Sequence, residues 1–200
     1  KGGAEIYTFE LAKALREGVA IVEWFSSRPK KLKKKEEIEG IKFIRKGNEF
    51  TTHFYGLLYA LKKRNWLIID ELNGMGFFTF FMKNSILLIY QLYSEFWTAE
   101  FGLLGHLLKS LEKFLLRQYR RKATITISPS TFEDLRELEF KDTTIIYSGV
   151  DIIPFANPLK KEESLTLTFL GRLKKTKTLR MLFKPFFLFV KLFMMQNFGS

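Results

Sequence analysis

Residues 143–172 read TTIIYSGVDIIPFANPLKKEESLTLTFLGR, and the order of patterns within them sets the organisation of the chain. A β-branched, apolar run ends in Ser148-Gly149, which predicts a strand followed by a turn. Two prolines and the charged run Lys160–Glu163 come next and indicate an exposed connector between domains. Leu165–Leu170 predicts a second buried strand, closed by Gly171-Arg172. One sheet is therefore expected to end here and another to begin.

Upstream of this stretch, the pattern predicts strands that alternate with helices. The expected strands are Val19–Phe25, Ile41–Ile44, Trp66–Asp70, Ser85–Tyr90 and Ala123–Ile127. Trp66–Asp70 and Ser85–Tyr90 are continuous apolar runs, typical of parallel strands buried on both faces. This alternation predicts an α/β domain over residues 1–153, with a doubly wound, mostly parallel, Rossmann-like sheet. Residues 154–163 are the predicted linker, and residues 164–200 the start of a second domain.

Three segments between these strands carry further expectations. The segment Ser27–Gly40 is Lys-rich and predicts a solvated loop; because no aromatic residue interleaves its lysines, base stacking on nucleic acid is disfavoured. The segment Glu49–Lys63 predicts a helix, and the segment Ser94–Lys122 a long helical region with a break at Gly102 or Gly105. The side chains expected on the buried side of the first helix are Phe50, Phe54, Leu57, Leu58 and Leu61. The apolar stripe of the second comprises Leu104, Leu107, Leu108, Leu111 and Leu115.

Charge and composition limit the partners that this chain could have. The formal net charge is +12, which suits a phosphate-bearing ligand, an anionic lipid surface or nucleic acid. Cations gather toward the end of the 94–122 region, where the helix dipole alone accounts for them and contact with anionic lipids is the alternative. With no cysteine, disulfides and thiolate metal sites are excluded. No signal peptide is visible, so the cytoplasm is expected, including the inner face of its membrane.

The strand, turn, linker and second strand of residues 143–172 resemble the junction between the two domains of a known family. In retaining, nucleotide-sugar-dependent glycosyltransferases of family four, a strand ends in (N/S)-G-V-D and the second domain opens with strand-G-R-x-x-x-x-K. The matching positions here are Gly149, Val150, Asp151, Gly171, Arg172 and Lys177. The resemblance implies the GT-B fold, transfer of a hexose from a nucleotide sugar to a glycan or lipid-linked acceptor, and no cofactor or essential metal.

The same resemblance implies where the donor binds. A G-G-x-E loop opens the first helix of the family and faces the donor diphosphate; here it is Gly2, Gly3 and Glu5. A glycine pair lets backbone N–H groups approach a phosphate at the positive end of a helix, although a flexible chain start is the simpler interpretation. In the family, Arg172 and Lys177 would neutralise the donor pyrophosphate.

Further site candidates follow the predicted strands, because ligands of open α/β sheets bind beyond the carboxyl ends of strands. Asp70, Glu71 and Asn73 are candidate contacts to substrate hydroxyls, with a simple turn as the equal alternative. The family usually has His-Asp after the next strand, whereas this chain has Tyr90-Gln91. Ser128 is a candidate donor-side contact. Asp70, Asn73, Tyr90 and Ser128 are expected at one rim of the sheet, beside Gly2-Gly3.

The chain departs from the family pattern at both ends. The strand that precedes the glycine loop in the family is absent, and residues 178–200 contain no acidic residue and many phenylalanines. The chain alone is therefore expected to be inactive. The tail is expected to cover apolar surface, with Leu182, Phe186, Phe189 and Phe193 as the buried stripe of a helix. The alternative function is a non-catalytic binding or assembly module that forms homo-oligomers through this aromatic tail.

Overall fold

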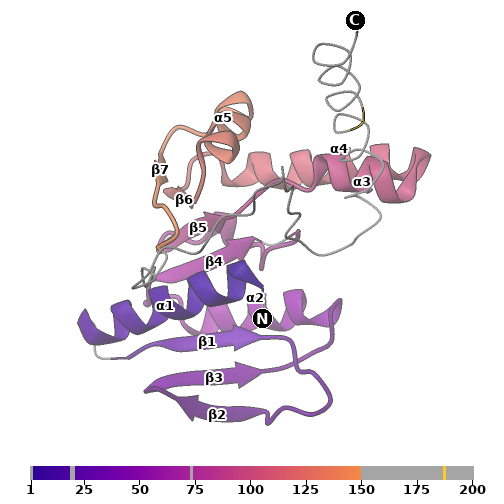
Figure 1. Ribbon diagram of the computed structural model, residues 1–200. Coiled ribbons are helices and arrows are strands. Elements are labelled where there is room, and N and C mark those ends of the chain that lie inside the picture. The colour runs from indigo at the N-terminus through magenta and orange to yellow at the C-terminus, as the bar shows by residue number, and fades with distance from the viewer. Residues whose placement is uncertain (1, 19–20, 73, 150–186, 188–200) are drawn as a thin grey trace, which may run out of the picture.

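The strands form two separate sheets in the part of the chain that the computed structural model describes, which is residues 2–18, 21–72, 74–149 and residue 187. The first sheet has the order β1-β3-β2, with β1 (Glu23–Ser26), β2 (Lys35–Ile38) and β3 (Ile41–Arg45). The second has the order β4-β5-β6-β7, with β4 (Ile68–Leu72), β5 (Ser85–Ile89), β6 (Thr124–Thr126) and β7 (Thr143–Ile145), all parallel (Figure 1).

Helices flank both sheets. They are α1 (Gly3–Gly18), α2 (Thr51–Lys62), α3 (Ser94–Phe101), α4 (Leu103–Tyr119) and α5 (Pro129–Glu137), and a 3-10 turn, η1, spans Thr79–Phe81. The predicted α/β class with a parallel, Rossmann-like sheet is therefore confirmed. The predicted linker and second domain lie outside the described residues, as does the aromatic tail except for Phe187, so the domain boundary and the role of the tail stay predictions.

The main core lies between the second sheet and the helices α4 and α5. Leu87 and Ile89 of β5 pack with Leu116 of α4 and Leu135 of α5, and all four are almost fully buried. A smaller cluster joins α1 to the first sheet, where Ala12 packs with Ile41 and Phe43. Apolar runs predicted these strands correctly, although β1 and β4 begin and end one to four residues later than expected.

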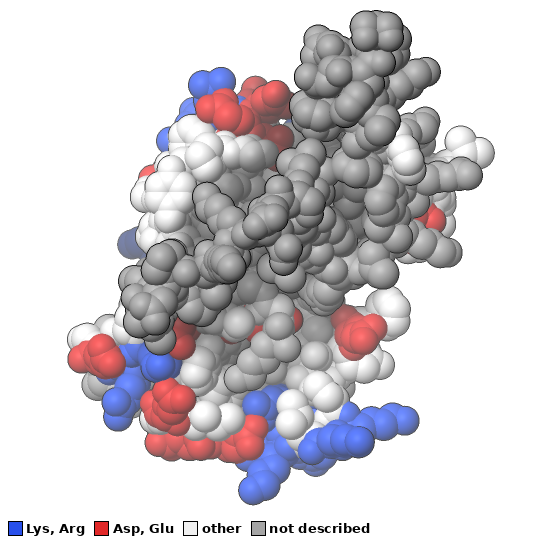
Figure 2. All heavy atoms as spheres, in the orientation of Figure 1, with Lys and Arg blue, Asp and Glu red and all other residues white. Residues whose placement is uncertain are grey.

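The prediction that Ser27–Gly40 is entirely loop is wrong, because it contains β2. Glu39 and Gly40 both have positive φ, 51° and 76°, so they form a two-residue turn whose twist suits a hairpin. Arg45 of β3 pairs with Glu36 of β2 at 2.5 Å, which ties the two strands together. The lysines before β2 are exposed, and Figure 2 shows Lys and Arg atoms gathered around the segment that joins β1 to β2.

The expected buried side of α2 is also wrong. Phe50 and Phe54 are 85% and 60% exposed, whereas Thr52, Gly56 and Ala60 are buried. The reason is close approach: a Cβ added at Gly56 would lie 2.2 Å from the Phe77 ring, so the helix packs through its smallest residues.

Helix α4 also packs through a glycine rather than through its leucines. The predicted break falls at Gly102, with φ 54°. After it, Gly105 packs so closely on α3 that an added Cβ would lie 2.1 Å from the carbonyl oxygen of Trp97. The leucine stripe points outward instead, with Leu104, Leu107 and Leu111 exposed.

A buried carboxylate fixes the segment between β4 and β5. Asp70 is fully buried in the middle of β4, and its Oδ1 accepts from the backbone N–H of Phe77 at 2.9 Å. Its Oδ2 accepts from the Thr79 hydroxyl at 2.8 Å and from the Tyr119 hydroxyl of α4 at 2.7 Å. One side chain thus joins β4, at the edge of the second sheet, to the following loop and to a covering helix.

We expect Asp70→Ala to destabilise the fold by about 3 kcal/mol, because it leaves the partly buried N–H of Phe77 and two buried hydroxyls without their acceptor. Urea unfolding measures the change. Asp134→Ala is the control, since Asp134 is exposed on α5 and should change stability by less than about 0.5 kcal/mol. Equal effects of the two substitutions would contradict the role given to Asp70.

Candidate functional site

The carboxyl ends of β5 and β6 form one edge of the second sheet, and two predicted site residues lie there. Tyr90 follows β5 directly. Ser128 follows β6 and caps α5, where its hydroxyl accepts from the Thr131 backbone N–H at 3.2 Å. The Thr131 hydroxyl donates to the carbonyl oxygen of Tyr90 at 2.9 Å, which links the two turns. Tyr90 and Ser128 are therefore neighbours at this edge.

The first turn of α1 meets the same edge. The Tyr90 hydroxyl donates to the carbonyl oxygen of Ala4 at 3.2 Å and also contacts the Thr8 hydroxyl. The Tyr7 ring lies edge-on to the Tyr90 ring, with 5.7 Å between the ring centroids. These contacts place Gly2 and Gly3 beside Tyr90, as the sequence predicted.

At the start of α1, the Glu5 side chain already accepts a hydrogen bond from one backbone N–H group, whereas the position of Gly3 has free space around it. The Gly2 N–H donates to Oε2 of Glu5 at 2.8 Å, so Glu5 caps the helix. A Cβ added at Gly3 would have no atom within 4 Å, so there is room for a side chain at this position of the first turn. First-turn N–H groups have no acceptor within their own helix, and the helix dipole favours an anion at this point.

Glu71 joins the cluster from β4. Successive side chains of a strand alternate between faces, so Glu71 points away from Asp70 and toward α1, where it forms a hydrogen bond with Thr8. Burial raises the pKa of the Glu71 carboxyl, and the charges of Glu5 and Asp70 raise it further, while the bond from Thr8 opposes the shift. Burial also raises the pKa of the Tyr90 hydroxyl, which keeps Tyr90 a hydrogen-bond donor near neutral pH.

The other predicted site residues fall into two groups. Asp70 lies in the middle of β4, because the strand continues to Leu72, and its carboxylate is engaged within the fold. This arrangement gives Asp70 a structural role, and its contact with substrate stays a prediction. Asn73, Arg172 and Lys177 lie outside the described residues. The edge thus brings together Gly2, Gly3, Glu5, Glu71, Tyr90 and Ser128.

Sequence reasoning missed three members of this edge. Tyr7, Thr8 and Thr131 contact Tyr90, yet none follows a strand, and the rule that ligands bind beyond strand ends did not select them. Helical spacing gave a weak indication of Thr8, because it lies four residues after Ala4 and so projects from the same side of α1 as the start of the glycine turn.

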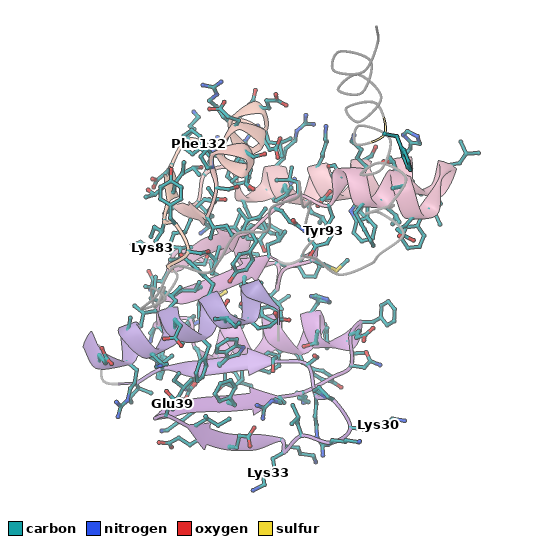
Figure 3. The ribbon with its side chains drawn as sticks, in the orientation of Figure 1. Lys30, Lys33, Glu39, Lys83, Tyr93 and Phe132 are labelled. Carbon is teal, nitrogen blue, oxygen red and sulfur yellow. The ribbon has the colours of Figure 1, made fainter. Side chains whose placement is uncertain are left out.

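Two other features of the described residues bear on function. A hollow of about 560 Å³ lies at the opposite edge of the second sheet, lined by Lys83, Arg121 and Lys122 among others, and Lys83 is labelled there in Figure 3. Among the described residues, no three His, Asp or Glu side chains are grouped to hold a metal ion, and none of the helices combines the length and apolar character that crossing a membrane requires.

Comparison with models of protein families, with curated proteins and with solved structures found no match for this chain.

We expect Glu71→Gln to raise the thermal stability at pH 7 and to lose this advantage as the pH falls through the raised pKa of the folded state toward 4.5, the ordinary pKa of the group. The raised pKa means that the folded state holds the proton more tightly than the unfolded state. The wild-type chain therefore loses stability as the pH rises through the folded pKa, whereas the amide does not titrate.

Thermal unfolding monitored by circular dichroism from pH 4 to pH 8 tests this pH dependence. Glu49→Gln provides the matched control, since Glu49 is exposed. A difference between Glu71→Gln and wild type that stays constant across this range would contradict the assignment.

Proposed function

We propose that this chain is the acceptor-side domain of a retaining glycosyltransferase that uses a nucleotide sugar. The observation that supports it is the meeting of a Gly-Gly helix start with Tyr90 and Ser128 at the carboxyl edge of a parallel sheet. In open α/β sheets this edge is the usual place for a phosphate-bearing ligand.

The proposed chemistry uses the edge to hold a diphosphate as it departs. The acceptor hydroxyl attacks the anomeric carbon from the side of the leaving group, the bond from carbon to the diphosphate oxygen breaks, and a diphosphate oxygen takes the acceptor proton. The first turn of α1 offers N–H donors to the developing negative charge, and Gly3 adds no side chain that would hinder the approach. Arg172 and Lys177, at the start of the predicted second domain, would supply the cations.

Tyr90 and Glu71 have separate roles in this proposal. Tyr90 stays protonated and fixes the first turn of α1 through Ala4. The Glu71 carboxyl would accept a hydrogen bond from a hydroxyl of the acceptor. Its hydrogen bond with the Thr8 hydroxyl supports this role. Neither needs a divalent metal or a cofactor for this task.

The Gly3→Asp variant tests the donor site. Position 3 has room for a side chain, and an acid in the first turn of a helix is favourable, so the variant should fold. The new carboxylate would repel a diphosphate: at about 4 Å, two like charges repel each other by roughly 1 kcal/mol or more, which lowers the affinity about fivefold or more. Chemical-shift titration of the labelled chain with UDP-glucose and GDP-mannose measures the effect.

Gly3→Ala is the matched neutral control and should keep the wild-type affinity. We expect the wild-type chain to bind these donors in the millimolar range or more weakly, without sugar transfer, and the shifts to gather around Gly2, Tyr90 and Ser128. Shifts elsewhere in the chain, equal affinity of Gly3→Asp and wild type, or stronger binding of single-stranded RNA would contradict the proposal.

We also propose that α4 contacts an anionic membrane surface, where a lipid-linked acceptor would be found. Leu103, Leu104, Leu107, Leu111 and Phe114 form an exposed stripe on the side of α4 opposite its buried residues. Lys109, Lys113 and Arg117 recur every four residues and so form a row beside this stripe. An exposed apolar stripe bordered by cations is typical of a helix that lies in the membrane interface.

Two matched phenylalanines test the membrane contact. Phe114 on α4 and Phe54 on α2 are 61% and 60% exposed, so replacing either with Glu makes the same chemical change on a helix surface. We expect Phe114→Glu to reduce co-sedimentation with vesicles that contain phosphatidylglycerol at least threefold, and Phe54→Glu to leave it unchanged. Equal binding of both variants, or equal binding of the wild-type chain to neutral phosphatidylcholine vesicles, would contradict the proposal.

A further inference from the structure

A hollow at the amino end of the second sheet gathers positive charge. Its volume is about 560 Å³, and the described residues that line it include Lys83, Arg121 and Lys122. This volume lies within the range of roughly 300–1,000 Å³ that is usual for sites of small ligands. Figure 3 labels Lys83, which precedes β5, and Tyr93, which follows it, on opposite sides of the second sheet. The hollow, called here the basic hollow, is therefore separate from the candidate site beside Tyr90.

The three cations of the basic hollow come from two turns. Lys83 lies between η1 and β5, whereas Arg121 and Lys122 lie between α4 and β6. The parallel pairing of β5 with β6 brings the two turns together. The Lys122 ammonium group joins them directly, because it donates to the carbonyl oxygen of Met82. The fold thus places cations from separate segments around one space.

Within the described part of the chain, these charges are not offset. No acidic residue is among those that line the basic hollow, and none of the ion pairs between described residues includes Lys83, Arg121 or Lys122. The bond to Met82 uses one of the three N–H donors of an ammonium group. Burial lowers the pKa of Lys122, because desolvation disfavours its charged form. A bound anion would offset that cost.

The end of helix α4 accounts for only part of this charge. The helix ends at Tyr119, and its dipole places about half a negative elementary charge there. Arg117 lies in the last turn and Arg120 caps it, so the helix already has cations of its own. Arg121 and Lys122 add to these, and Lys83 comes from a different turn. The basic hollow therefore holds more positive charge than the helix end requires.

A second hollow beside the first is a weaker candidate for an anion. Its volume is about 430 Å³, and it shares Arg121 with the basic hollow. Its lining also includes Arg120 and Glu139, and these two form an ion pair at 3.1 Å. An anion would have to compete with this carboxylate in the second hollow, whereas no acid of the described lining opposes it in the basic hollow.

We propose that the basic hollow binds a phosphate group. The planar guanidinium group of Arg121 can donate to two phosphate oxygens at once, and Lys83 and Lys122 add two point charges. A doubly charged phosphate suits three cations better than a singly charged carboxylate does. The phosphate can belong to a free anion or to a lipid head group, since both present the same oxygens.

Paired substitutions test this site. Lys83→Gln and Arg121→Gln each remove one charge from the basic hollow, and Lys33→Gln and Arg136→Gln are the matched controls. All four side chains are exposed, so the variants should fold. The full chain, labelled for NMR, is titrated with sodium pyrophosphate and, separately, with monomeric dihexanoyl-phosphatidylglycerol.

We expect both ligands to shift the amides of Lys83, Ser85 and Ala123 in a saturable way, with half-saturation at about 1 mM or lower for the tighter one. Each substitution in the hollow should weaken binding roughly threefold or more, and the two together roughly tenfold or more, because each removes one attractive charge. The controls should bind as the wild-type chain does. Tighter binding of pyrophosphate would identify a free anion as the source, and tighter binding of the lipid a head group.

Four results would overturn the proposal. The first is the absence of saturable shifts at Lys83, Ser85 and Ala123, including the case in which pyrophosphate shifts only the amides around Tyr90. The second is equal affinity of the double variant and the wild-type chain. The third is equal shifts with sodium chloride at matched ionic strength, which would mean general screening. The fourth is tighter binding of a single-stranded uridine oligonucleotide at the same amides, which would mean a nucleic-acid surface.

Discussion

The carboxylate of Asp70 is the contact on which the packing around the second sheet depends. It holds the N–H of Phe77 and the side chains of Thr79 and Tyr119, so a loop and a helix are fixed to β4 at one point. Phe77, once fixed, presents its ring to Gly56 of α2 and to Phe25 of β1. A single buried acid thereby determines how closely α2 can approach and how the first sheet is placed relative to the second. Burial of this polar side chain is tolerated because four donors from the protein, two backbone N–H groups and two hydroxyls, replace water.

Asp70 and Glu71 are consecutive acids with opposite roles, and the difference follows from strand geometry. Alternation directs Asp70 to the face covered by α4, where several donors surround it. Glu71 is directed to the α1 face, where one hydroxyl contacts it and its pKa rises because burial is not offset by enough donors. The sequence predicted both as substrate contacts, since both follow an apolar run. It could not show which of them has its donors within the fold, because those donors come from residues up to 49 positions away.

The parts of the fold that could be predicted from sequence are those governed by local pattern. Buried apolar runs predicted β4 and β5, Gly102 predicted the break between α3 and α4, and the Ser128 turn was placed beside a strand end. The errors arose where packing opposed the pattern. Charged residues form β2 because a Glu39-Gly40 turn pairs them with β3. In α2 the large residues face outward, because the Phe77 ring lies so close to Gly56 that no larger side chain fits there.

The candidate site and the break between the sheets lie at the same place, and one cause explains both. In a doubly wound sheet the helices diverge to opposite faces at the switch point, and this divergence leaves the space in which ligands bind. Here α1 and α2 diverge across the break, and the first turn of α1 ends at its carboxyl edge, beside Tyr90. The hydroxyl contacts of Tyr90 and Thr8 hold α1 to the second sheet, and the ring contacts of Phe9 hold it to the first. Helix α1 therefore ties the position of the glycine turn to the packing of both sheets, so a change in how the two sheets pack will also move the donor groups at the candidate site.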